Sequence, residues 1–187
     1  MYITFGELYV SLDRWDRLED WELHLSQCEL GMIKLTDDFH YRGSLFSITV
    51  FRDSQRLGIG FLSKETSLPP SIIVDYRRSK LIIGTNTEVF FIDVNQGVKA
   101  SSFTLGHLFY QFYTLSHLGF DNIFLVLNEL GIDCLTYDGA PVWTYNAHDI
   151  ISDLIVNASG IEVNLFEGGK QKLAIATGSI IASDTTK

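Results

Sequence analysis

Hydrophobic and polar residues alternate along much of this chain with a period of two, which is typical of β-strands. The pattern runs through residues 44–51 and 56–62, and Asp53-Ser54-Gln55 separates these two segments. Shorter alternating segments, 21–25 and 31–35, extend it toward the N-terminus. We therefore expect an antiparallel meander of strands over roughly the first 65 residues.

Two segments favour helices instead. Residues 12–18 place Leu12, Trp15 and Leu18 at helical spacing, with acidic residues early enough to suit a helix N-terminus. Residues 105–118 repeat apolar side chains at three- and four-residue steps. One or two short helices are therefore expected within a chain that otherwise consists of strands.

Three segments share one layout, in which an apolar strand, a polar turn and a second alternating strand are followed by a turn that contains glycine. They are residues 81–97, 124–139 and 154–169. Each is expected to form a β-hairpin, because strands with this pattern and spacing pair through short turns. Repetition of this kind indicates one structural unit used several times.

At these residues the chain resembles β-propeller blades of the quinoprotein and YVTN kind. The closest match is 137–143, Tyr-Asp-Gly-Ala-Pro-Val-Trp, in which an Asp-Gly turn precedes a strand with Trp. Residues 92–97 match without the Trp, and the third copy, ending at 176–178, keeps its glycines but has neither Trp nor Asp. The resemblance covers about 72–183 and implies antiparallel units in series. About two and a half units are visible, whereas a closed propeller takes at least four.

The expected fold is therefore mostly β, with serial antiparallel hairpins in a propeller-like or open sheet. We expect a single domain, 1–187, because a chain of 187 residues is short for two. Pro69 and Pro70 cannot donate hydrogen bonds to a sheet, so the internal boundary is placed there. It separates a possible meander half, 1–66, from the blade-like repeats, 71–183.

The net charge of −9 is unevenly distributed along the chain. Residues 1–30 and 81–187 are acidic, while residues 31–80 have a small basic excess. The most basic cluster, 77–80, holds three charges beside an expected turn, which is too little for a nucleic-acid surface. No secretory signal and no apolar run of membrane-spanning length is visible, so we expect a cytoplasmic protein without nucleic-acid or membrane partners.

The motifs of several enzyme classes are missing from the sequence, including the Gly-x-Ser-x-Gly elbow, the phosphate loop and His-Glu-x-x-His. Gly58-Ile59-Gly60 lacks the third glycine of a dinucleotide-binding loop. None of the five histidines pairs with another or with Cys at metal-ligand spacing, so no metal or cofactor is expected. Cys28 and Cys134 are most simply small buried hydrophobic residues.

The most polar and aromatic constellation lies at residues 143–153. If this segment is extended, Asp149 and Asp153 share a strand face, with His148 beside them and Trp143 nearby. These four residues are the candidate binding site. The simpler interpretation is that both carboxylates are solvated residues flanking a buried strand, and that Trp143 belongs to the core, as is usual for large aromatic side chains.

These observations favour a non-catalytic binding protein, for example of the immunity or assembly type, acting through an acidic β-rich surface. Its expected partner is another protein, or a second copy, docked along a sheet edge with unpaired backbone groups. The alternative is a small carbohydrate- or small-molecule-acting enzyme whose carboxylates converge in three dimensions. Two carboxylates within about 5–10 Å suffice for glycoside hydrolysis, and Asp37, Asp38, Asp149 and Asp153 are the candidates.

Overall fold

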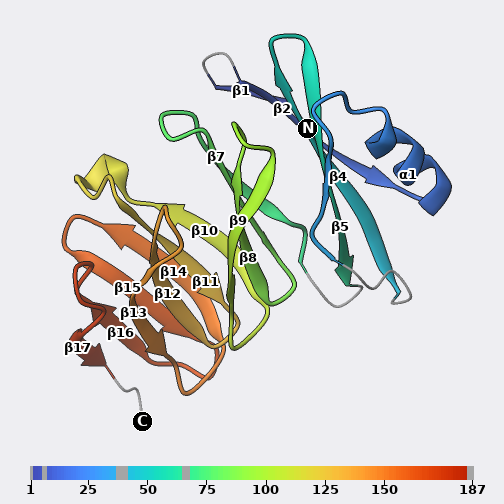
Figure 1. Ribbon diagram of the computed structural model, residues 1–187. Coiled ribbons are helices and arrows are strands. Elements are labelled where there is room, and N and C mark those ends of the chain that lie inside the picture. The colour runs from blue at the N-terminus through green and yellow to red at the C-terminus, as the bar shows by residue number, and fades with distance from the viewer. Residues whose placement is uncertain (1, 6–7, 37–41, 65–67, 185–187) are drawn as a thin grey trace. The chain divides into compact units, whose positions relative to one another are not determined.

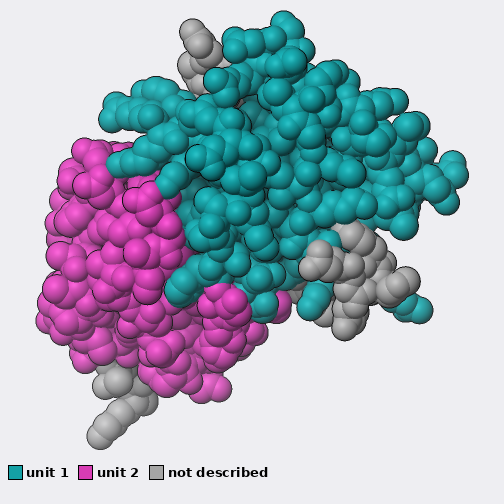
Figure 2. All heavy atoms as spheres, in the orientation of Figure 1, with its two compact units in different colours: residues 1–103 teal, residues 104–187 magenta. Residues whose placement is uncertain are grey.

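The computed structural model describes residues 2–5, 8–36, 42–64 and 68–184 of the chain (Figure 1). The described residues form four open β-sheets with one α-helix and one short 3-10 helix, so the expected mostly-β fold is confirmed. None of the helices in this part of the chain has the length and apolar character that a bilayer crossing requires. The chain divides into two compact units, residues 1–103 (unit 1) and 104–187 (unit 2), coloured separately in Figure 2.

Unit 1 contains a five-stranded sheet, called sheet A, and a four-stranded sheet, called sheet B. Sheet A has the order β1-β2-β4-β5-β3 and sheet B the order β6-β7-β8-β9. Strand β3 pairs with β5 in parallel, which departs from the expected all-antiparallel meander. The strands of sheet A are β1 (Tyr2–Phe5), β2 (Leu8–Trp15), β3 (Met32–Lys34), β4 (Gly43–Arg52) and β5 (Gln55–Lys64); those of sheet B are β6 (Ser71–Asp75), β7 (Lys80–Thr85), β8 (Glu88–Asp93) and β9 (Val98–Thr104).

Unit 2 contains two four-stranded antiparallel meanders, called sheets C and D, in which every strand pairs with its neighbour along the chain. Sheet C consists of β10 (Phe109–Thr114), β11 (Ile123–Asn128), β12 (Gly131–Thr136) and β13 (Pro141–Asn146); sheet D consists of β14 (Ile151–Asn157), β15 (Gly160–Leu165), β16 (Lys170–Leu173) and β17 (Ile180–Asp184). The 3-10 helix η1 (Ser116–Leu118) lies between β10 and β11.

The three expected hairpins are confirmed. They are β7–β8, β11–β12 and β14–β15, each with continuous antiparallel pairing next to its turn. The closing glycines Gly97, Gly139 and Gly168 have φ angles of 66°, 87° and 93°. Only glycine adopts this left-handed backbone without steric cost, which explains why glycine recurs at that place in the repeat.

Both expected helices are wrong in position. Leu12 and Trp15 belong to β2, which pairs with β4 from Tyr9 to Trp15, so strand pairing overrides the local helical spacing. The segment 105–118 forms strand β10 followed by the short helix η1. Within β10, the ring of Phe112 packs edge-on against the ring of Phe124 on the neighbouring strand β11. Aromatic and β-branched residues pack well on a pleated sheet, which accounts for the strand.

The only α-helix of the described residues, α1 (Leu18–Ser26), covers a segment whose alternation predicts a strand. Trp21 and Leu25 are fully buried, whereas Leu23 is 58% exposed. Residues four apart share a helix face, but residues two apart do not. The burial of Trp21 and Leu25 fits both the strand period of two and the helical spacing of four. The exposure of Leu23 distinguishes them, because a strand would place Leu23 on the same face as Trp21 and Leu25.

Helix α1 packs on β5 at two glycines. A Cβ atom on Gly60 would lie 2.3 Å from Cζ2 of Trp21, and one on Gly58 would lie 2.9 Å from Cδ2 of Leu25. The Trp21 indole also donates to the carbonyl oxygen of Phe46 over 2.9 Å. The Gly58-Ile59-Gly60 sequence therefore provides room for a helix against a strand.

Each unit has a hydrophobic core of its own, formed between its two sheets. In unit 1 the core draws on Ile48, Ile59 and Phe61 from sheet A and on Leu81 and Phe90 from sheet B. In unit 2 it draws on Leu125, Ile132 and Cys134 from sheet C and on Ile161 and Val163 from sheet D. Burial of these side chains, about 1.5–3 kcal/mol for each large one, holds each pair of sheets together.

Candidate functional site

Trp143 lies on β13 and has a structural role. Its indole nitrogen donates to the carbonyl oxygen of Ile175 over 2.9 Å. A Cβ atom on Gly178, whose φ is 66°, would lie 2.5 Å from Cε3 of Trp143, so the backbone runs directly against the ring. Trp143 therefore connects sheet C to the segment between β16 and β17, as expected for a packed residue in preference to an exposed stacking platform.

Asp153 lies on β14, on the face of sheet D that points away from the core of unit 2. Its carboxylate accepts hydrogen bonds from the backbone N–H of Leu154 over 2.9 Å and from the amide of Asn164 over 3.5 Å. Asn164 is also its register partner on β15. Asp153 is exposed and takes part in a polar row across the outer face of the sheet.

His148 and Asp149 lie in the connection between β13 and β14. Asp149 is half-buried, and its carboxylate accepts hydrogen bonds from the backbone N–H groups of Ile150 and Glu167, each over 2.7 Å. His148 is exposed beside it. The structure thus places Asp149 and His148 in one loop, but it gives Asp149 and Asp153 different partners. Asp37 and Asp38 lie outside the described residues.

The loop that holds Asp149 forms one edge of unit 2 together with the β15–β16 turn. The backbone N–H of Phe166 donates to the carbonyl oxygen of Ile150 over 2.9 Å, and that of Ile151 donates to Glu129 over 3.2 Å. We call the set Glu129, Asp149, Ile150, Phe166 and Glu167 the Phe166 rim. Gly168 and Gly169, both with positive φ, close the turn that positions Phe166.

Phe166 is 74% exposed and Ile150 is 39% exposed. Sequence reasoning missed Phe166, although the alternation contains the signal. Side chains on β15 alternate between the two faces, and Glu162 and Asn164 point away from the core. Phe166 lies two residues after Asn164, so the same alternation predicts that it also points away from the core, which is an unusual location for a phenylalanine.

The sequence around the rim is strongly acidic. Residues 100–169 contain no Lys or Arg but eight acidic residues, of which the rim contributes Glu129, Asp149 and Glu167. Unit 2 as a whole has nine acidic and three basic residues, whereas unit 1 has fourteen and eleven. The exposed apolar pair therefore lies in the more negative of the two units.

Several buried groups have pKa values shifted by their surroundings. Burial raises the pKa of Asp133, while hydrogen bonds from Thr144 over 2.7 Å and Asn128 over 3.0 Å partly offset this effect. Burial also raises the pKa of Cys134 to about 12 and raises that of Cys28, so both thiols are held in the protonated, unreactive form. Both cysteines are buried, as expected from the sequence. In the part of the chain that the structure describes, no three His, Cys, Asp or Glu residues are grouped so as to hold a metal ion.

The outer edge of sheet D is strand β17, which pairs only with β16 among the described strands. Ile180 and Ile181 are 54% and 56% exposed. Residues 180–183 contain no charge and no proline, which are the features that usually discourage pairing at a sheet edge.

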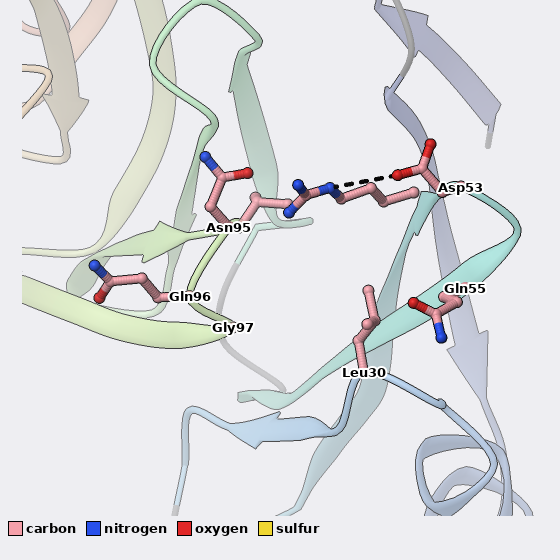
Figure 3. Close-up of a pocket in the computed structure, with 8 residues that line it drawn as sticks. Leu30, Asp53, Gln55, Asn95, Gln96 and Gly97 are labelled. Atoms are coloured by element: carbon pink, nitrogen blue, oxygen red, sulfur yellow. Dashed lines mark ion pairs between the residues drawn. The ribbon is translucent and has the colours of Figure 1, made fainter.

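Unit 1 has an open pocket of about 370 Å³ (Figure 3). Three turns form its walls: the segment after α1 at Leu30, the β4–β5 turn at 52–55 and the β8–β9 turn at 94–97. Arg52 and Asp53 form an exposed ion pair at one side, with Nε and Oδ2 separated by 3.9 Å.

Comparison with known proteins identifies the fold but not a family. No protein-family profile and no curated protein matches the sequence. The solved structure of the computationally designed Ika8 protein is similar, with a TM-score of 0.53 and 12% identity over 98% of this chain. This chain spans 60% of the Ika8 chain. The computationally designed Ika4 protein matches with a TM-score of 0.49 and 12% identity, over 64% of this chain and 74% of that one.

Proposed function

We propose that the protein is a non-catalytic binding protein and that the Phe166 rim of unit 2 binds a basic segment of a partner protein. The observation that carries the proposal is a 74% exposed phenylalanine whose backbone is hydrogen-bonded to that of an exposed isoleucine, in a segment that contains acidic residues but no Lys or Arg. Exposed apolar side chains rimmed by polar groups are typical of protein-binding surfaces. Aromatic anchors of this kind provide much of the energy of such interfaces.

The rim is held in place before any partner binds. Backbone hydrogen bonds link Phe166 to Ile150 and Ile151 to Glu129, and the Asp149 carboxylate fixes the N–H of Glu167. A surface held in its binding geometry loses little conformational entropy on association. The Asp149 carboxylate therefore serves mainly to position the turn.

The charge distribution supports a basic partner. The rim has three carboxylates, and no Lys or Arg occurs in 100–169. A partner segment with Lys or Arg beside an apolar side chain would complement both features. Such a complex would form faster at low salt, because electrostatic steering is screened as ionic strength rises.

Docking along β17 is a second route to the same class of function. An extended segment of a partner, or β17 of a second copy, would satisfy the backbone groups on the free edge of sheet D. Ile180 and Ile181 are consecutive residues of this strand, so their side chains point to opposite faces and would contribute apolar contacts on each face of the extended sheet.

The carbohydrate-acting enzyme is not favoured by any contact among the described residues. Asp149 is engaged with two backbone N–H groups, and Asp153 with Leu154 and Asn164. Carboxylates occupied in this way act as structural acceptors.

The test is binding of fluorescently labelled peptides to the full chain. One peptide contains Lys and Arg around a Leu-Trp pair, and its matched partner has the same apolar residues with Glu and Asp. We expect the basic peptide to bind and Phe166→Ala to weaken it by about tenfold or more. Ile155→Ala is the matched control, because Ile155 is a 45% exposed apolar residue on the outer face of sheet D, away from the rim. Equal binding of the acidic peptide, or no effect of Phe166→Ala, would contradict the proposal.

A further inference from the structure

The pocket of unit 1 is preformed, and its walls are fixed by contacts outside the pocket itself. The backbone N–H of Leu30 donates to Arg56 over 2.9 Å, while Arg56 binds the carboxylate of Glu29 over 2.8 Å. The β8–β9 turn is closed by Asp93, which accepts hydrogen bonds from the N–H groups of Gln96 and Gly97, each over 2.9 Å. A ligand would therefore meet a pocket that is already shaped.

The pocket has polar groups without internal partners. The side-chain amides of Gln55 and Asn95 form no hydrogen bond with any described residue. Each amide offers two donor hydrogens and an acceptor oxygen. Figure 3 shows Asn95 and Gln55 on different turns around the same opening, with Leu30 below.

The charges of the pocket cancel. Arg52 and Asp53 are its only charged residues, and they pair with each other. A ligand with a net charge would therefore gain attraction from one member of the pair and repulsion from the other. The remaining lining is apolar, from Leu30 and Val94, or consists of amides.

The β4–β5 turn keeps side chains where the backbone favours glycine. Asp53 and Ser54 have φ angles of 47° and 67°, at the two positions of a hairpin turn where Asn-Gly is preferred. This turn type requires positive φ at both positions, and serine adopts it there with strain, as Ser79 does in the β6–β7 turn. Here the strained turn presents the Asp53 carboxylate at the edge of the pocket.

We propose that this pocket binds a small neutral polyhydroxyl ligand of the mono- or disaccharide class. A hydroxyl group donates and accepts at once, so it matches the amides of Gln55 and Asn95 as well as Arg52 and Asp53. Leu30, which is 40% exposed, supplies apolar surface for the C–H face of such a ring. The volume of about 370 Å³ falls within the range of small-molecule pockets.

The experiment is a titration of the ¹⁵N-labelled full chain with glucose, galactose, mannose and N-acetylglucosamine, followed by ¹H–¹⁵N NMR. We expect at least one sugar to give saturable shifts at the amides of residue 30 and of 52–55 and 94–97. Asn95→Ala and Gln55→Ala should each weaken binding by about fivefold to tenfold, because each removes a hydrogen-bonding group. Asn146→Ala is the matched control, since Asn146 is an exposed amide on β13 in unit 2.

Glutamate and inorganic phosphate serve as charged probes. The proposal is overturned if none of the four sugars gives saturable shifts at these amides, or if the charged probes bind there more tightly. It is also overturned if both amide variants keep the wild-type affinity. The spectrum of each variant shows whether it is folded, so a loss of binding cannot be confused with unfolding. The result is independent of the Phe166 rim, whose amides lie in unit 2.

Discussion

The two units bury their sheets in different ways. In unit 1, α1 approaches β5 so closely that Trp21 and Leu25 occupy the space of side chains at Gly58 and Gly60. In unit 2, polar groups of aromatic side chains join the sheets: the Trp143 indole donates to Ile175, and the Tyr145 hydroxyl donates to Gln171 over 2.8 Å. Both units therefore combine an apolar core with close packing at glycines, but the glycines of unit 1 receive a helix, whereas the indole and hydroxyl groups of unit 2 link one sheet to the other.

The largest expected effect concerns the glycines. Gly60→Ala should destabilise unit 1 by about 3 kcal/mol, because the new methyl group must displace the fully buried Trp21 and Leu25. Gly106→Ala is the control in unit 2, since a Cβ atom added at Gly106 would have no neighbouring atom within 4 Å. Denaturant unfolding of each variant, monitored by hydrogen exchange at the amides of each unit, measures the change in stability. A small effect of Gly60→Ala would mean that α1 can move away from β5 at little cost.

The second effect concerns Asp133 and concentrates in unit 2. Burial raises the pKa of Asp133 above its ordinary value of 3.8, so the folded state keeps its proton at a pH where the unfolded chain has lost it. The free energy of unfolding should therefore fall as pH rises from 3.8 through the raised pKa. Asp133→Asn should remove this part of the pH dependence. Its unfolding free energy measured across the acidic range checks the prediction, and an unchanged slope would contradict it.

Unit 1 should respond to pH in the opposite direction, through an exposed pair. The hydrogen bond from Arg56 is the main cause that lowers the pKa of Glu29 from 4.5 to about 2. The contribution of this pair is present above pH 4.5 and is lost as pH falls toward 2. Glu29→Gln should flatten this loss, with hydrogen exchange at Leu30 and Arg56 as the local readout. The effect should be smaller than that of Asp133, because solvent screens the pair.

The smallest effect is expected at Ser54. Glycine adopts a φ of 67° without steric strain, whereas serine does not. Ser54→Gly should stabilise unit 1 by about 0.5 kcal/mol, because the relief of strain exceeds the extra entropy of glycine in the unfolded chain. Ser116→Gly in η1 provides the comparison, because Ser116 is also an exposed serine but is not among the residues with positive φ. Thermal unfolding of both variants checks the prediction.

Much of the fold was predictable from the sequence. Hairpins such as β7–β8 combine alternation with a two-residue turn, and both signals are local. The helix was not predictable in this way, because Trp21 and Leu25 satisfy a period of two and a period of four equally. The parallel pairing of β3 with β5 depends on the position of α1, which no local pattern specifies.

The candidate site was predictable in part. The sequence drew attention to His148 and Asp149, which lie in the loop that supports the Phe166 rim. Phe166 itself fits the end of an apolar strand in the sequence pattern, because phenylalanine is usually buried. The sequence could not show that Trp143 and Asp153 bind other parts of the protein, since their hydrogen-bond partners, Ile175 and Asn164, come from other segments of the chain.

The order of strands also has a consequence for the folding of the chain. Sheets B, C and D pair only strands that follow one another, so each requires only short loops to close. Sheet A pairs β2 with β4 and β3 with β5, and α1 lies within the longer of these connections. Native contacts between distant residues slow folding, because the entropy of loop closure is lost before the contacts form. During synthesis, the first strands of sheet A are made before those of any other sheet, but sheet A cannot be completed until β5 has emerged. Each later meander can form as soon as its own four strands are available, so formation of sheet A is the step most exposed to delay.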